Sequence, residues 1–357
     1  MEKKNYTLHL PLGKLLQSST FNLEKAVCSH GFFMMAPNNW DSSTKVLRRP
    51  FRLSSNSRTI ILVHIYQPSS NASVLHVQVD TKHPMSAHDQ KILLAQVTRM
   101  LRISEKDERD ITKFHDIHSE AESIGFGRIF RSPTLFEDIV KCILLCNCGW
   151  DRTLAMVKSL CDLQMSFTKT RSKRRDRVKC EGEPLMSGDF PTWEELASVD
   201  AEFLKKHCNL GYRANTIIRL ATMIKSGKLS LENFEKDEDF DGARKKLQHI
   251  KGIGVFISDY VVTCIGDYQK IPADTETIRH ITEIHARKNC NLKTVQKLAE
   301  EIYGKFAPFQ YLAYWFELWK YYEEEFGNLS ALSPDAYRIV TGSTSNRGKG
   351  KGGIQMK

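Results

Sequence analysis

The sequence predicts an α+β fold in which an antiparallel sheet precedes an all-helical region. Two runs rich in β-branched residues, 59–66 and 72–79, flank a Pro-Ser-Ser-Asn turn, which is the pattern of a β-hairpin. From Ser86 onward apolar residues recur at intervals of three and four, which predicts a helix. Beyond Pro133 almost every segment has this helical period. A sheet domain followed by a helical bundle is therefore expected.

The same patterns divide the chain into three parts. We expect an α+β domain over 1–118, a helical domain over 119–330, and a disordered basic tail over 331–357. A charge-rich loop is expected over 168–189, and seven of its residues between 168 and 179 are basic. This loop fits a nuclear import signal, a nonspecific DNA contact or a solvated segment, and the sequence leaves all three open.

Composition restricts the classes of partner. Across 357 residues the net charge is +10, with 52 Lys+Arg against 42 Asp+Glu, which suits a polyanionic partner. No apolar run reaches the length of a membrane span, so no membrane partner is expected. The nine cysteines show no zinc spacing, and no cysteine beyond Cys290 is available for an iron–sulfur cluster. We therefore expect free thiols and no metal site. We also expect the chain to be a monomer.

A break in the helical pattern at 252–254 is the most informative local feature. Gly252 and Gly254 flank Ile253, and apolar residues keep the helical period on both sides. Glycine tolerates the backbone that closes a helix, so this break predicts two short helices joined by a tight turn. The amide groups at the start of the second helix then form a site for one phosphate. The alternative is a helix end that binds nothing.

A single carboxylate follows the hairpin at a short distance. Asp274 comes two residues after Pro272 and directly before a helical run. It is either a functional carboxylate or a helix N-cap, and a position at a helix N-terminus favours the ionised form that catalysis requires.

The hairpin followed by Asp274 resembles the helix-hairpin-helix (HhH-GPD) DNA glycosylase superfamily, and the resemblance extends over 21–326. The segments 29–32, 131–137, 142–147, 190–197 and 210–214 are similar to parts of the 8-oxoguanine branch. The resemblance implies a nuclear enzyme of base excision repair that binds double-stranded DNA containing a damaged base.

The residue at position 256 decides the expected chemistry. Bifunctional members of the family carry a lysine nucleophile two residues after the second glycine, whereas this chain has Phe256. An aromatic residue there is similar to the 3-methyladenine glycosylase II branch. The resemblance thus implies a monofunctional glycosylase in which Asp274 is catalytic and the substrate is an alkylated purine. The alternatives are an inactive DNA-binding protein and an 8-oxoguanine-type glycosylase/lyase.

The resemblance also assigns the remaining site residues. The base pocket is expected to contain Gly31, Phe256, Glu276, Tyr311 and Trp315. The family's hole-filling loops correspond to Asn147 and Tyr212, with Arg152 beside the unpaired base. The full set of expected DNA-binding residues is Asn147, Arg152, Tyr212, Arg213, Lys251, Gly252, Ile253 and Gly254. No cofactor is expected, apart from a monovalent cation at the hairpin carbonyls that the resemblance implies.

Overall fold

A computed structural model describes residues 4–12, 21–54, 59–69, 72–81, 84–172, 188–236 and 238–342. Its sheet has five antiparallel strands in the order β1-β5-β4-β3-β2. The strands are β1 (Lys4–Pro11), β2 (Asn39–Asp41), β3 (Val46–Arg52), β4 (Ile60–Tyr66) and β5 (Val74–Thr81). The predicted hairpin corresponds to β4 and β5, which pair from Leu62 opposite Asp80 to Tyr66 opposite His76. The predicted α+β class is thereby confirmed.

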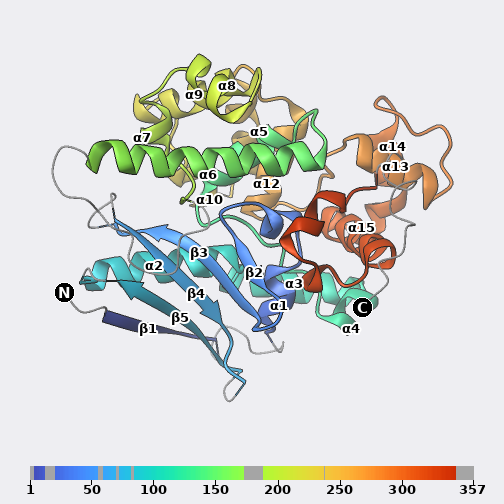
Figure 1. The fold of residues 1–357 in the computed structure, drawn as a ribbon. Helices are drawn as coiled ribbons and strands as arrows, with labels where there is room; N and C mark the ends of the chain where they lie inside the picture. Colours follow the sequence, from blue (N-terminus) through green and yellow to red (C-terminus); the bar gives the residue numbers. More distant parts are fainter. Residues whose placement is uncertain are drawn as a thin grey trace, which may run out of the picture.

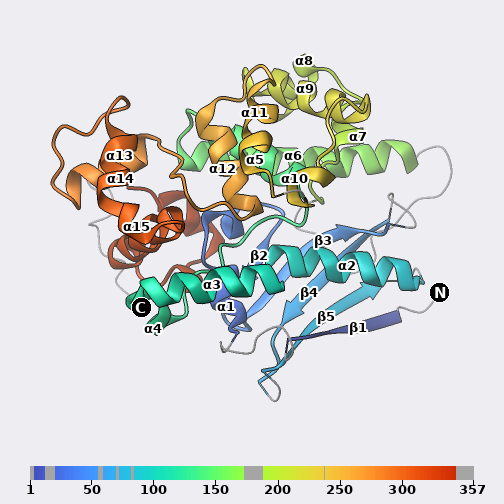
Figure 2. The same cartoon turned by 180° about the vertical axis from the view of Figure 1, so that it is seen from behind.

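One face of the sheet is covered by helices. Buried and half-buried residues alternate along β4 and β5, as expected for a sheet with one packed face. The helices α2 (Ala87–Met100) and α3 (Glu105–Ile117) run across the sheet (Figure 2). A capping box between Ser86 and Asp89 starts α2 where the apolar period begins in the sequence.

The helices beyond the sheet form two groups (Figure 1). The group above the sheet consists of α5 (Leu135–Leu145), α6 (Trp150–Ser172), α7 (Trp193–Leu196), α8 (Ala201–Cys208), α9 (Arg213–Lys225), α10 (Glu232–Lys236), α11 (Phe240–Gln248) and α12 (Val255–Ile265). The group beside β2 consists of α13 (Thr275–Glu283), α14 (Val295–Tyr303) and α15 (Gln310–Phe326), together with η2 (Gly304–Phe306), η3 (Leu329–Ala331) and η4 (Pro334–Ile339). Short helices α1 (Leu23–Val27), η1 (Gly31–Met34) and α4 (Ser119–Ile124) complete the described structure. No helix among the described residues is both long and apolar enough to cross a membrane.

Two predicted boundaries are corrected by the structure. The loop expected from residue 168 begins later, because α6 continues to Ser172, and residues 173–187 lie outside the described part of the chain. The tail expected to be disordered from residue 331 is ordered to 342. Tyr337 in η4 is buried, and the centroid of its ring lies 5.4 Å from that of Phe33. Its backbone carbonyl accepts a hydrogen bond from the Trp150 indole. Burial of this aromatic ring offsets the entropy of ordering the segment.

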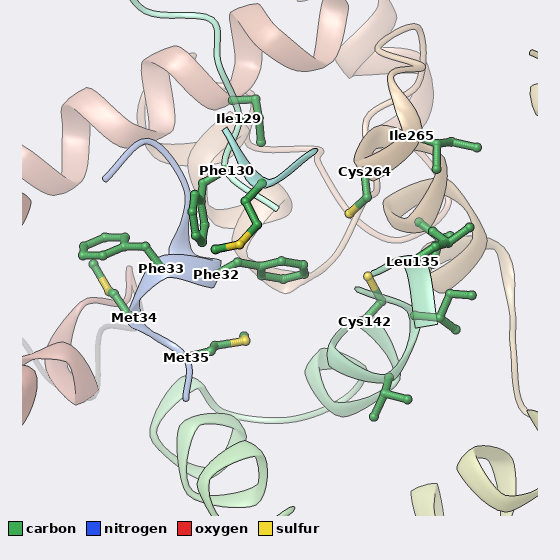
Figure 3. Close-up of a cluster of buried hydrophobic side chains, with 14 of the residues drawn as sticks. Phe32, Phe33, Met34, Met35, Ile129, Phe130, Leu135, Cys142, Cys264 and Ile265 are labelled. Carbon is green, nitrogen blue, oxygen red and sulfur yellow. The ribbon is translucent and has the colours of Figure 1, made fainter. Parts of the chain in front are cut away.

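A single apolar core joins the sheet region to the helices. In Figure 3, Phe32 and Phe33 of η1 pack near Phe130, while the thiols of Cys142 on α5 and Cys264 on α12 lie in the same cluster. Further buried contacts cross residue 118, since the Trp40 indole donates a hydrogen bond to the carbonyl of Ser330. The division into domains at residue 118 therefore stays a prediction.

A fully buried charge cluster connects β3 to α5. Two guanidinium nitrogens of Arg49 donate to the two carboxylate oxygens of Glu137, at 3.0 and 2.6 Å. The ammonium group of Lys141, one helical turn along, lies 2.7 Å from the same carboxylate. Burial tends to raise the pKa of Glu137, but Arg49 and Lys141 outweigh it and lower the pKa to about 2.

Glu137→Gln should destabilise the chain by about 3–5 kcal/mol, because it leaves two buried cations without their shared counter-ion. Denaturant unfolding at neutral pH measures this loss. Asp162→Asn is the control, since its pair with Lys158 is exposed and is worth at most about 1 kcal/mol. Because the folded pKa of Glu137 is depressed, its contribution is complete above the ordinary value of 4.5 and is lost as the pH falls toward about 2. Equal stability of the two variants would contradict this assignment.

Candidate active site and nucleic-acid interface

The predicted hairpin is formed by α11, a short turn and α12. Gly252 has a φ of +104°, and a Cβ there would overlap the hydroxyl of Thr216 on α9, so only glycine fits. Gly254 is the N-cap of α12 and has ordinary extended backbone with open space around it. Ile253 is buried and anchors the turn, whereas Lys251 and both glycines are exposed. No side chain caps α12, so the N–H groups of its first turn are open to an anion.

The monovalent cation implied by the resemblance fits this hairpin poorly. The carbonyl of Lys251 accepts a hydrogen bond of 2.6 Å from the Arg219 guanidinium, and the carbonyl of Ile250 accepts one from Ile253. A guanidinium already lies on the turn and repels a second cation. We therefore assign no cation to the hairpin.

Asp274 is held in one orientation at the N-terminus of α13. Its Oδ1 accepts hydrogen bonds from the Thr277 amide, at 2.9 Å, and from the Thr277 hydroxyl, at 3.1 Å. That hydroxyl lies 3.1 Å from the Tyr314 hydroxyl on α15. The capping box therefore fixes the carboxylate and links it to α15. Capping and a catalytic role are compatible for this residue.

The pKa of Asp274 departs from the sequence expectation. The helix N-terminus was expected to favour the ionised form, and the Thr277 amide does lower the pKa. Burial acts more strongly in the opposite direction, and the nearby charge of Glu276 adds to it, so the pKa is raised. Burial also raises the pKa of Tyr260, and the Asp274 charge contributes to that shift. The carboxylate thus lies in an apolar setting close to α12 and α15.

Aromatic side chains from three separate segments meet beside this carboxylate. Tyr311 is buried, Trp315 is half-buried, and their rings stack with centroids 6.1 Å apart. The ring of Tyr260 lies 5.7 Å from Phe256, 6.4 Å from Tyr311 and 6.0 Å from Phe32 of η1. The structure thereby brings two predicted pocket residues, Phe256 and Tyr311, next to Tyr260, with Trp315 stacked on Tyr311. Sequence reasoning missed Tyr260, although it lies one helical turn after Phe256.

His30 is a second residue that sequence reasoning missed. Its Nε2 lies 3.0 Å from the Tyr260 hydroxyl, and its ring centroid is 4.7 Å from that of Trp315. Burial, with the charges of Arg102 and Lys141, lowers the pKa of His30 to about 3. The imidazole is consequently neutral at physiological pH and adds no positive charge to this region.

The two remaining predicted pocket residues are Gly31 and Glu276. Gly31 begins the short helix η1, and a Cβ there would lie 3.1 Å from the Trp150 ring. Glu276 forms an ion pair with Arg279 and accepts a hydrogen bond from Tyr322 at 3.0 Å. Its carboxylate is therefore already engaged within α13 and α15.

The two predicted hole-filling loops are adjacent in the structure. Asn147 follows α5, is exposed and has a φ of +50°, which asparagine tolerates better than most residues. Tyr212 precedes α9, and its side chain is 56% exposed. Arg152 is exposed. Its guanidinium lies beside Gly211, next to Tyr212, at 3.9 Å from where a Cβ of residue 211 would be. These side chains are exposed, and their contact with DNA stays a prediction.

Arg213 is a buried residue of the predicted interface. Only 3% of this residue is exposed, and its guanidinium donates to the carbonyls of Cys146 and Asn147. The same group lies 4.7 Å from the centroid of the Tyr212 ring. Its Nε and Nη2 donors are occupied by the loop, so Arg213 holds the two loops together, and a contact of this residue with DNA stays a prediction.

Comparisons with known proteins give a consistent result for the fold. No family model and no curated sequence matches the chain. Among solved structures, MBOgg1 in complex with a low-affinity DNA ligand has a TM-score of 0.61 at 18% identity, with 92% of this chain and 100% of that chain covered. The 3-methyladenine DNA glycosylase from Archaeoglobus fulgidus has a TM-score of 0.61 at 16% identity, with 89% and 98% covered. The apo 8-oxoguanine glycosylase/lyase of Clostridium acetobutylicum has a TM-score of 0.57 at 15% identity, with 88% and 98% covered.

These structures include both enzyme types that the sequence resembles, an 8-oxoguanine glycosylase/lyase and a 3-methyladenine DNA glycosylase. The chain has the fold of the helix-hairpin-helix DNA glycosylases.

Proposed function

We propose that this chain is a DNA glycosylase of base excision repair that hydrolyses the bond between deoxyribose and a damaged purine in double-stranded DNA. The observation that carries the proposal is the carboxylate of Asp274, which is half-buried and held in one orientation by the Thr277 amide. Burial raises the pKa of this group, so its ionised form costs stability, which is typical of a group retained for chemistry. The shared fold supplies the supporting context.

The chemistry follows from the charge that develops on the sugar. The target nucleotide leaves the stack, and the bond from C1′ to the base nitrogen breaks with its electron pair going to the base. The sugar then has oxocarbenium character, which the negative charge of Asp274 stabilises. Water adds to C1′, its proton passes to the solvent or the carboxylate, and an intact abasic site remains.

The aromatic composition of the site favours an alkylated purine. Phe256, Tyr260 and Trp315 are half-buried and present ring surface to a flat ligand. A ring face attracts a cation, and an alkylated purine is positively charged. The neutral state of His30 supports this choice, because a protonated imidazole beside Trp315 would repel such a base.

The same proposal assigns roles to the surface. The open amide groups of α12 bind one backbone phosphate of the duplex, with Lys251 beside them. Tyr212 and Asn147 occupy the space that the extruded nucleotide leaves, on loops held by Arg213. We further propose that the enzyme acts as a monomer in the nucleus, as the charge pattern of the sequence suggests.

A DNA-binding protein without catalysis is the second candidate function. It is favoured by Phe256, since the amine of the bifunctional enzymes is missing at this position. The binding function requires the hairpin, and it accounts for Asp274 only as the N-cap of α13. The two candidates therefore differ in the expected behaviour of Asp274 variants.

The hairpin is tested with a pair of variants that differ by one charge. Gly254→Asn and Gly254→Asp both fit the open space and can cap α12. The aspartate places a negative charge against the phosphate, which costs roughly 1–4 kcal/mol for charges 4 Å apart and weakens binding about tenfold or more. Fluorescence anisotropy with duplex DNA at several salt concentrations measures the difference. Equal affinity of the two variants would remove the hairpin from the interface.

Asp274→Asn should abolish base release while leaving the fold intact. Asparagine keeps the acceptor for the Thr277 amide, but loss of the charge should slow release from alkylated duplex by on the order of a hundredfold or more. Because the folded pKa is raised, the ionised carboxylate lowers stability at neutral pH, so the variant should unfold at the wild-type temperature or above it. Wild-type activity should fall on acidification earlier than an ordinary aspartate would cause. Undiminished release by the variant would exclude Asp274 as the catalytic group.

The absence of a lysine at position 256 predicts a glycosylase without lyase activity. Borohydride should trap no protein–DNA adduct with the wild type, and abasic sites should be cut only after added alkali, because no imine forms. Phe256→Lys restores an amine in the first turn of α12 and should give a trapped adduct, whereas Phe256→Met should not. A wild-type adduct would overturn the monofunctional mechanism. The amine of Lys141 would then be examined first, since it lies 5.4 Å from the centroid of the Phe32 ring.

A further inference from the structure

A compact cluster of metal-binding side chains lies at the base of α13, away from Asp274 at the helix N-terminus. His280 belongs to α13, His285 follows that helix, Tyr303 ends α14, and Glu317 lies in α15. The Nε2 atoms of His280 and His285 lie 3.3 and 2.9 Å from the same Oε2 of Glu317. The Tyr303 hydroxyl lies 2.5 Å from this oxygen and 3.0 Å from the His285 Nε2. Three elements therefore direct their donor atoms at one point.

The bonding of His280 is incomplete. Its side chain is 0% exposed, and neither ring nitrogen has a hydrogen-bond partner within the described structure. Its Nε2 nevertheless lies close to the Glu317 oxygen, so only the alignment for a hydrogen bond is missing. A buried polar group without a partner costs free energy, and a metal ion would supply the missing partner for Nε2.

The charge of the cluster points in the same direction. Glu317 supplies the carboxylate of this cluster. Its ion-pair partners within the described residues are the two histidines, which are cationic only when protonated. Carboxylates in such settings are paired or coordinate a metal.

We propose that His280, His285 and Glu317 bind a divalent transition-metal ion, with Zn²⁺ as the reference ion and Tyr303 as a neighbouring oxygen donor. The three ligand atoms all lie within 4.8 Å of one another. Zinc takes imidazole nitrogen and carboxylate oxygen at about 2.0–2.2 Å, so the ligand atoms need only small shifts to complete the site. Two imidazoles select Zn²⁺ over Mg²⁺ or Ca²⁺, which prefer oxygen ligands.

The site would stabilise the part of the molecule that carries the candidate catalytic groups. α13 begins at the Asp274 cap, and α15 carries Tyr311 and Trp315. An ion bound between His280 and Glu317 joins these two helices directly. Metal binding of this kind adds to folding stability, so its detection does not depend on glycosylase activity.

The test is metal content and stability of the full chain after removal of bound metal with a chelator. The wild type should retain about one Zn²⁺ per chain after loading and gel filtration, and Zn²⁺ but not Mg²⁺ should raise its unfolding temperature. Glu317→Gln still accepts hydrogen bonds, and His285→Gln removes one nitrogen ligand. Each should weaken Zn²⁺ binding by about a hundredfold, since loss of even an outer-shell partner costs roughly 10–100-fold. His76→Gln is the control, because the His9–His76 ring pair lies on the sheet outside the cluster.

The outcomes separate the possible sources of binding. Retention of one Zn²⁺ by both cluster variants would place the metal on cysteine or on the His9–His76 pair and overturn the proposal. No tight Zn²⁺ binding by the wild type would leave the cluster as a hydrogen-bonded network and would also overturn it. If the variants fail to fold, Co²⁺ on the wild type decides the question. Visible ligand-field bands without a thiolate charge-transfer band support the nitrogen–oxygen site, and their absence contradicts it.

Discussion

The packing of the helices on the sheet depends on one buried ion-pair cluster, whose centre is the carboxylate of Glu137. This carboxylate accepts hydrogen bonds from two guanidinium nitrogens of Arg49 on β3. It also forms an ion pair with the ammonium group of Lys141 on its own helix. The geometry of a bidentate pair fixes the distance and the angle between β3 and α5. The Lys141 ammonium in turn lies over the ring of Phe32, in the segment that carries His30. The N-terminal region is thereby held against α12 and α15, where the candidate site forms.

That site separates two tasks that one element could not perform together. The hairpin and the Asn147 and Tyr212 loops carry exposed groups, while Asp274 is half-buried. Exposure suits contact with a polyanion, because the open amides of α12 need only approach a phosphate. Burial suits a charge that must act on a developing cation, because a low dielectric strengthens their attraction. The hydrogen bond of Arg213 fixes the Asn147 loop, and that of the Thr277 amide fixes the Asp274 carboxylate.

The raised pKa of Asp274 and the lowered pKa of His30 have the same physical origin. His30 is buried and Asp274 is half-buried, and burial disfavours the charged form of each. For the histidine this removes a positive charge beside Trp315, and for the aspartate it creates a carboxylate that gains from a nearby cation. The charges of Arg102 and Lys141 also act on His30, so the neutral imidazole keeps a further cation out of a region that already has two nearby.

The sequence by itself determined the α+β class, the β4–β5 hairpin and the turn at Gly252 and Gly254, because each depends on local periodicity or on the freedom of glycine. Only the tertiary structure decided which side chains meet. Arg213 looked like a surface cation but is buried against the Asn147 loop, and the segment around Tyr337 is packed rather than disordered. His30 and Tyr260 are 230 residues apart, and their contact leaves no local pattern. The direction of the Asp274 pKa likewise depends on burial by distant helices, which no spacing in the sequence records.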